Sequence, residues 1–247
     1  MTISSQADLD GMSRIGQLVG QALQHMSGSV RPGMTTRELD EIGAKFLSSQ
    51  GARSGPQLAY DFPGFNCISV NEEAVHGVPR GRVLRDGDVL KIDVTAELNG
   101  YIADAAVTVV VGKGSVRARR LRDCARSAFC KALEFARAGT AVAELGRAVE
   151  SEVKQQGFAV LEELTGHGVG RAVHEAPQVP NYYAASTRGT LLDGMVIALE
   201  PIISEKPAHI VTEKDGWTLR THNRALAAHY EHTIVIRDGA PLVLTAI

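Results

Sequence analysis

The chain has 247 residues, 44% of them hydrophobic and 22% charged, which is the balance of a globular protein able to bury a core. Its formal net charge of −2 gives no overall reason to expect DNA or an anionic membrane as a partner, so any binding specificity should be local. The three cysteines, Cys67, Cys124 and Cys130, show neither a disulfide-framework spacing nor a CxxC pair, which favours a reducing cytoplasm. Because the N-terminal residues lack an apolar signal segment and no apolar run could span a membrane, we expect a cytoplasmic protein without a membrane partner.

Two helices are predicted before residue 51. The first is amphipathic, because apolar side chains recur at spacings of three and four between Met12 and Met26, and Arg31-Pro32-Gly33 ends it. A capping box at residues 35–38 begins the second helix, which should run to about Gln50.

This second segment is repeated later in the chain. Residues 31–51 and 137–157 share Arg, Gly, Glu-Leu and Gln-Gly at a constant offset of 106 residues. Each copy follows a longer predicted helix, the later one at about 115–136, and precedes strand-like sequence. Two such halves, about 12–112 and 115–240, predict a duplicated α+β fold in which helices cover one face of a curved mixed or antiparallel sheet, with a site where the halves meet.

Five arginines lie on the helix predicted at 115–136. Apolar residues such as Leu121, Ala125 and Ala128 form its other face, so we interpret the arginines as a solvated surface in preference to an RNA contact. They are Arg117, Arg119, Arg120, Arg122 and Arg126.

Residues 91–104 predict a β-hairpin with Asn99-Gly100 as its two-residue turn. In that register Thr95 faces Asp104, and Asp93, Thr95 and Asp104 point to the same side. Two carboxylates about 7–8 Å apart at Cβ can reach a common cation or a pair of cations, and repel each other without one. The alternative is that one aspartate lies at a strand end in water, but Asp93 is flanked by apolar residues, where an unpaired charge would be costly.

Histidines occur in two predicted loops. His76 precedes Gly77-Val78-Pro79, and a lone loop histidine is usually a surface residue. His167 and His174 lie seven residues apart in the glycine-rich segment 166–177, which lacks the glycine spacing of a phosphate-binding loop. Imidazole is a common metal ligand and proton carrier, so this pair indicates a functional segment.

Two further acidic residues accompany apolar strands. Glu200 ends the strand predicted at 194–201, and Glu231 lies near the start of the strand at 230–236. Glutamate is rarely buried without a partner, so both residues are expected to have cationic partners. These partners could be metal ions or basic side chains.

Collected, the candidate metal ligands are Asp93, Asp104, His167, Glu200 and Glu231. The four carboxylates would be neutralised by two divalent cations, and oxygen-rich ligation with one imidazole suits Mn, Fe(II), Co or Zn. Two metals about 3.5–4 Å apart can activate water and polarise a carbonyl, which is metal-assisted hydrolysis.

These residues lie in four segments that resemble the type I methionine aminopeptidases. The segments are KIDVT…GYIAD (91–104), GHGVGRAVHEAP (166–177), MVIALEP (195–201) and YEHT (230–233). The resemblance extends from about residue 12 to residue 245, and all five ligand positions match in order and context. It implies the "pita-bread" fold and a single catalytic domain over residues 1–247.

The resemblance also implies a centre of two divalent metal ions, Co, Mn, Fe(II) or Zn. Asp93 would be a bidentate ligand, Asp104 and Glu231 would bridge the metals, and His167 and Glu200 would complete the coordination. Glu200 would also carry the proton from the attacking water to the leaving amine.

By the same resemblance, six further residues would bind the substrate. His76 and His174 would contact it and stabilise the tetrahedral intermediate, and Thr95 would assist in binding its α-amine. The methionine pocket would be lined by Phe62, Cys67 and Trp217.

The implied reaction is removal of the initiator methionine from nascent proteins and peptides, with preference for a small second residue, by attack of a metal-bridging hydroxide on the first peptide bond. The resemblance places this reaction in the cytoplasm. The chain itself shows no feature of obligate assembly, so we expect a monomer, and the arginine-rich helix is a candidate surface for the ribosome.

Two positions depart from the family pattern: Ala59 stands where tyrosine is common, and His229 where glutamine is common. They bear on pocket shape and side-chain preference, because the ligands are unchanged. Two alternatives share part of the pattern. A prolidase or Xaa-Pro aminopeptidase has the same ligands but usually an additional N-terminal domain. A non-catalytic binding module would usually have lost ligands that are all present here.

Overall fold

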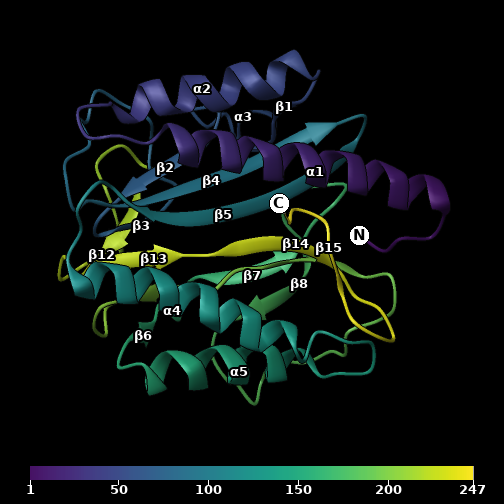
Figure 1. Cartoon of the computed structure of the whole chain (residues 1–247). Helices are drawn as coiled ribbons and strands as arrows, with labels where there is room; N and C mark the ends of the chain where they lie inside the picture. The colour runs from purple at the N-terminus through teal and green to yellow at the C-terminus, as the bar shows by residue number, and fades with distance from the viewer. Residues whose placement is uncertain (247) are drawn as a thin grey trace.

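The computed structural model describes residues 1–246, in which the long helices form two pairs. The pairs are α1 (Gln6–Ser29) with α2 (Thr36–Ser49), and α4 (Val116–Leu133) with α5 (Val142–Gln155). Figure 1 shows the first pair above the central strands and the second pair below them. A short helix, α3 (Gly55–Tyr60), follows the first pair.

The largest sheet has nine strands, and every pairing in it is antiparallel. Its order is β1-β4-β5-β14-β9-β7-β8, with β2 added on β4 and β15 on β14. Its strands are β1 (Arg53–Ser54), β2 (Cys67–Val70), β4 (Val89–Leu98), β5 (Tyr101–Val110), β7 (Thr165–Gly168), β8 (Glu175–Pro180), β9 (Val196–Leu199), β14 (Glu231–Val235) and β15 (Leu242–Val243).

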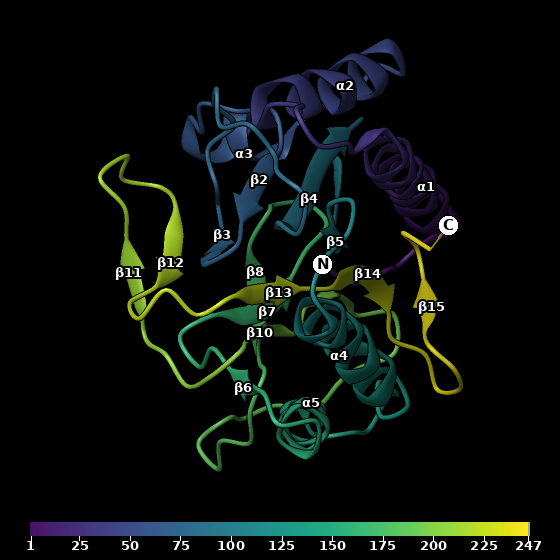
Figure 2. The ribbon, with the colours of Figure 1, turned by 60° about the vertical axis from the view of Figure 1, so that its left-hand side comes forward.

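Two three-stranded antiparallel sheets accompany it, in the orders β13-β10-β6 and β11-β12-β3. Their strands are β3 (Glu73–Val75), β6 (Ala159–Val160), β10 (Ile202–Ser204), β11 (Ile210–Thr212), β12 (Leu219–Thr221) and β13 (Ala227–His229). In Figure 2, β11 and β12 extend from the body of the molecule beside β3.

Each pair of helices has its own hydrophobic core. One cluster joins α1 and α2 to β2, β4 and β5, and includes the fully buried Ile15 and Ile92. The other joins α4 and α5 to β9 and β14, and includes the fully buried Leu121 and Ile197. This is the α+β arrangement predicted from the sequence, and the ladders are antiparallel, which is one of the two expected forms of the sheet. Over residues 1–246, no helix combines the length and apolar character needed to cross a membrane.

The predicted repeat coincides with α2 and α5. Both helices have 14 residues, and the offset of 106 residues relates the first residue of one to the first residue of the other. The flanking glycines adopt matching left-handed backbones, with φ of 89° at Gly33 and 88° at Gly139, and 78° at Gly51 and 80° at Gly157. Side-chain-bearing residues rarely adopt these angles, which gives a physical reason for glycine in both copies.

The starts of helices α1 and α2 are set by local capping. The capping box predicted for α2 is confirmed, since Thr35 and Glu38 each accept a hydrogen bond from the other's backbone N–H. Helix α1 begins earlier than the apolar pattern from Met12 indicated, because the Ser5 side chain caps it and Gln6 is its first residue.

Helix α3 ends with Ala59 and Tyr60, Ser54 caps its start, and Pro56 favours its first turn. One prediction of a loop was wrong. His167, expected in a glycine-rich loop, lies within strand β7. Glycines on both sides of this histidine concealed the strand, because glycine is depleted in strands.

The predicted hairpin is confirmed residue by residue. Asp93 pairs with Ala106 and Thr95 pairs with Asp104, so β4 and β5 have the expected register. The turn at residues 99–100 has φ of 53° and 80°, as a type I′ turn requires.

The β5–β14 seam, where strand β5 of the first half meets strand β14 of the second, is short. Its ladder holds two residue pairs, 105 with 232 and 106 with 231. Beyond one end, the Thr233 hydroxyl donates to the Asp104 carbonyl at 2.8 Å and accepts from the Asp104 N–H at 2.9 Å. Beyond the other, the Thr108 hydroxyl bonds the backbone of His229 in the same way, at 2.8 and 2.9 Å. Threonine hydroxyls therefore replace backbone pairing where the strands separate.

Thr233→Val should lower the free energy of unfolding by about 2 kcal/mol, because it leaves a buried N–H and a buried C=O of Asp104 without this partner. Chemical denaturation of the two proteins measures the difference. Thr212→Val, at the exposed end of β11, is the matched control and should change stability by less than about 0.5 kcal/mol. Equal effects of the two substitutions would contradict a role of the hydroxyl in the seam.

Candidate metal centre

A cavity of about 630 Å³ is lined by all eleven site residues predicted from the sequence. Its walls come from both halves of the chain, so the expected meeting of the halves at one site is observed. The predicted ligands in the lining are Asp93, Asp104, His167, Glu200 and Glu231, and the other predicted residues are Phe62, Cys67, His76, Thr95, His174 and Trp217.

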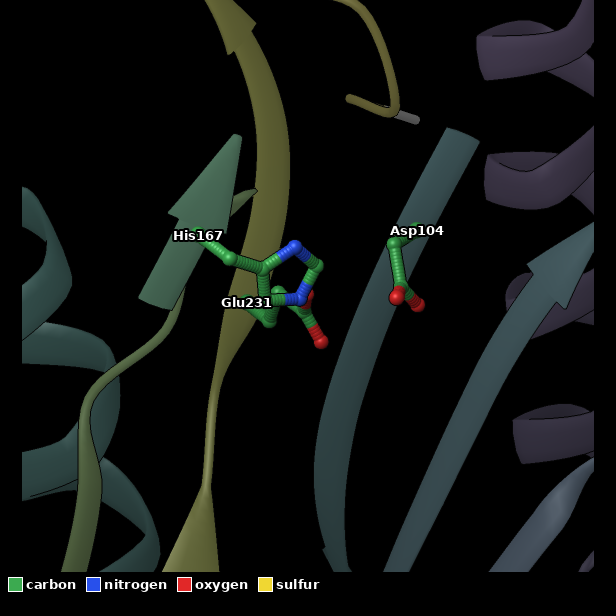
Figure 3. Close-up of side chains that lie close together, drawn as sticks. All are labelled: Asp104, His167 and Glu231. Atoms are coloured by element: carbon green, nitrogen blue, oxygen red, sulfur yellow. The ribbon is translucent and has the colours of Figure 1, made fainter. Parts of the chain in front are cut away.

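Three of the predicted ligands form one compact group. Asp104 on β5, His167 on β7 and Glu231 on β14 each offer a donor atom, and these atoms lie within 4.8 Å of one another. Figure 3 shows the three side chains pointing toward a common space between the strands. All three side chains are buried.

A second group shares Glu231 and adds Glu200 and His229, again with donor atoms within 4.8 Å of one another. Oε1 of Glu231 and both ring nitrogens of His229 are buried and have no hydrogen-bond partner. Buried polar atoms without partners are costly, and a cation between these side chains would satisfy them. The donor set therefore fits divalent metal ions.

Burial and mutual repulsion strongly raise the pKa values of three of the four acidic groups. Burial and the neighbouring Asp104 raise the pKa of Asp93 well above its usual range, and burial and Glu231 do the same to the pKa of Asp104. Burial and the charge of Glu200 raise the pKa of Glu231 to about 7. Carboxyl groups in this condition bind either protons or cations, so metal binding should release protons.

Glu200 is the exception among the four carboxyl groups. Burial disfavours its charge, but the nearby imidazoles of His167 and His229 outweigh burial and lower the pKa of Glu200 to about 2. Its Oε1 lies 3.2 Å from Nε2 of His167, and its Oε2 lies 3.4 Å from Nε2 of His229. Glu200 thus remains ionised in the cavity.

His167 and Thr95 are held in defined orientations. Nδ1 of His167 lies 2.9 Å from the carbonyl oxygen of Gly168, which can only accept, so Nδ1 carries a proton and Nε2 faces the cavity. The Thr95 hydroxyl donates to Oδ1 of Asp104 at 2.8 Å. Both contacts orient candidate ligands before any metal binds.

Two further histidines stand at the cavity wall. His76 follows β3 with φ of 56°, an uncommon backbone for a side-chain-bearing residue, and burial lowers its pKa. His174 precedes β8, and partial burial together with His167 lowers the pKa of His174 to about 4. Both imidazoles are therefore neutral near pH 7.

Tyr60 is a cavity residue outside the predicted set. Its hydroxyl lies 2.5 Å from Nδ1 of His174, although 114 residues separate them in the sequence. No sequence signal indicated this contact. His229 is another cavity residue outside that set, and its spacing of two from Glu231, which places both on one side of an extended chain, was the available signal.

The far wall is apolar. The rings of Phe62 and Trp217 meet edge to face with centroids 5.3 Å apart, and Cys67 is buried beside Asp93. Burial, and to a smaller extent the charge of Asp93, raises the pKa of the Cys67 thiol well above its usual range. This side chain therefore contributes a neutral, polarizable surface.

The model of metallopeptidase family M24 matches residues 10–238. A curated relative, methionine aminopeptidase 2 of Bacillus subtilis (strain 168), is 43% identical over 249 residues, covering 100% of both chains. This far exceeds the 22% identity to the prolidase of Pyrococcus furiosus, a solved structure with a TM-score of 0.80 that covers 100% of this chain and 66% of that one and shows the fold alone.

The crystal structure of methionine aminopeptidase from Thermotoga maritima superposes with a TM-score of 0.95 at 33% identity, and each chain covers 100% of the other. The pita-bread fold expected from the sequence is confirmed by these neighbours. The chain belongs to metallopeptidase family M24, among its methionine aminopeptidases.

Proposed function

We propose that this protein removes the N-terminal methionine from peptides and nascent proteins in a reaction that depends on divalent metal ions. The observation that carries the proposal is a single cavity with buried carboxylate and imidazole donors on one wall and Phe62, Cys67 and Trp217 on another. The similarity to methionine aminopeptidases over the whole chain supports the same function.

Asp93, Asp104, His167, Glu200 and Glu231 would hold two divalent metal ions. Bound there, the metals would supply Lewis-acid polarisation of the scissile carbonyl and acidification of water. The ionised carboxylate of Glu200 would take the proton of the attacking water and pass it to the leaving amine.

The neutral histidines would stabilise the charge that develops on the substrate carbonyl oxygen. Burial and Asp104 raise the pKa of Tyr60, so its hydroxyl stays protonated. It donates a hydrogen bond to Nδ1 of His174. The ring proton of His174 is then on Nε2, where it can be donated to the substrate. His76 would act beside it, and Tyr60 is a positioning residue in this proposal.

The walls define which substrate fits. The apolar wall of Phe62, Cys67 and Trp217 suits an unbranched thioether side chain. The acidic groups, with Thr95 beside Asp104, would accept hydrogen bonds from a free α-amine, which makes the reaction that of an exopeptidase.

The proposal includes the setting of the reaction. The protein would act in the cytoplasm as a monomer with a single catalytic domain. Its substrates would be nascent chains with a small second residue, and the arginines of α4 are the candidate surface facing the ribosome. Arg117, Arg119, Arg120 and Arg126 are exposed on that helix, which leaves them accessible to a partner.

Protein treated with a chelator should release no amino acid from Met-Ala-Ser, and resupply of Mn, Co, Fe(II) or Zn should restore the release of methionine. Leu-Ala-Ser should be cleaved at least about tenfold more slowly, because a branched side chain fits the pocket less well. Quantification of free amino acids measures both. Metal-dependent cleavage of an Ala-Pro dipeptide in preference to Met-Ala-Ser would instead support a prolidase.

Glu231→Gln should lower kcat by at least about a thousandfold, because loss of this shared donor removes several kcal/mol of metal-derived stabilisation. Metal content by elemental analysis should fall as well. Glu162→Gln, an exposed neighbour of the cavity, is the control and should retain full activity. Full activity of Glu231→Gln would rule out the shared ligand.

Tyr60→Phe should lower kcat about fivefold with little change in KM or metal content, because it removes one hydrogen bond of about 1 kcal/mol that orients His174. Tyr183→Phe, on an exposed segment, is the control. Steady-state kinetics separate the two parameters, and a higher KM at unchanged kcat would assign Tyr60 to substrate binding instead.

A further inference from the structure

The position of His229 in the cavity is not explained by the five predicted ligands. The residue is 2% exposed, and its Nε2 lies 3.3 Å from Oε2 of Glu231 and 3.4 Å from Oε2 of Glu200. Neither ring nitrogen has a hydrogen-bond partner. The ring therefore points into the space between two candidate metal ligands.

The backbone holds His229 rigidly in this place. Its N–H and C=O are both bonded to the Thr108 hydroxyl, at 2.9 and 2.8 Å, and it pairs with Ile202 in the β10–β13 ladder. A fully buried ring on such a fixed backbone has little freedom to turn away from Glu200 and Glu231. The arrangement suits a ligand, because preorganised donors bind metal without a cost for reordering.

Two states of the ring are compatible with these neighbours. A protonated imidazole would form ion pairs with Glu200 and Glu231, but it would be repelled by divalent cations bound to the same carboxylates. A neutral imidazole instead offers a lone pair on Nε2, which lies beside the carboxylate oxygens of Glu200 and Glu231 and could bind the same cation. Once the centre is loaded, only the neutral ring is favourable.

We propose that His229 is a further metal ligand that binds through Nε2 together with Glu200 and Glu231. This inference rests on the proposed metal-dependent function. It gives the centre six protein ligands with two imidazoles, His167 from β7 and His229 from β13, in place of five ligands with one. An added nitrogen donor should favour Co and Zn over Mn, following the general preference of imidazole.

Zinc X-ray absorption spectroscopy of the native protein loaded with two equivalents of Zn²⁺ tests this directly. The scattering from imidazole rings gives the number of histidine ligands per zinc ion. The expected value is two imidazoles per two zinc ions in the native protein and one in His229→Gln. His222→Gln, an exposed histidine outside the cavity, is the matched control and should retain two.

Calorimetric titration with Zn²⁺ gives a second readout. The affinity of one of the two sites should fall at least about tenfold in His229→Gln and remain unchanged in His222→Gln. One imidazole in the native protein, with unchanged zinc affinity in His229→Gln, would overturn the proposal and leave His229 as a hydrogen-bond donor.

The experiments distinguish a failure of the ligand proposal from a folding defect and from a failure of the proposed function. If His229→Gln fails to show a native circular dichroism spectrum, the native imidazole count alone decides, and His229→Asn provides the variant for titration. Two imidazoles in a protein that releases no methionine would uphold the ligand and reject the proposed function. One imidazole in a protein that releases methionine would do the reverse.

Discussion

Mutual repulsion among four carboxyl groups, all lining one cavity, is the interaction on which the rest of this structure depends. Asp93 and Asp104 come from one hairpin, whereas Glu200 and Glu231 come from the other half of the chain. Burial and proximity disfavour their charges, as the raised pKa values of Asp93 and Asp104 show. Cations, or protons, must balance this charge for the fold to be stable, so the core and the site cannot be considered separately.

Much of the site could be predicted because local rules control it. The Asn-Gly turn sets the hairpin register, and the register alone puts Thr95 opposite Asp104. The recurrence of Arg, Gly, Glu-Leu and Gln-Gly at an offset of 106 residues revealed the duplication, and the left-handed backbones of Gly33 and Gly139 explain why glycine is kept in both copies. The residues predicted to bind substrate, such as His76, were named through family resemblance rather than through the pattern around them, and they line the cavity.

What could not be predicted depends on contacts between distant segments. The hydrogen bond from Tyr60 to His174 joins residues from opposite halves, and the Thr108 and Thr233 hydroxyls act across the β5–β14 seam. His229 was noted in the sequence as a departure from a common glutamine, and its spacing of two from Glu231 relates it to that residue alone. Its place between Glu200 and Glu231 depends on the contact with Glu200, which comes from a separate strand.

The shortness of the β5–β14 seam has a consequence for the protein's lifetime. Only two residue pairs and two threonine hydroxyls join the strands there, yet the donor groups lie on both sides. Metal ions would therefore act as a cross-link between the halves, adding about 2.7 kcal/mol per site at a free concentration one hundred times Kd. Metal starvation would then favour local opening of the seam and proteolysis, so that trace-metal supply would govern how much of the protein persists as well as how fast it works.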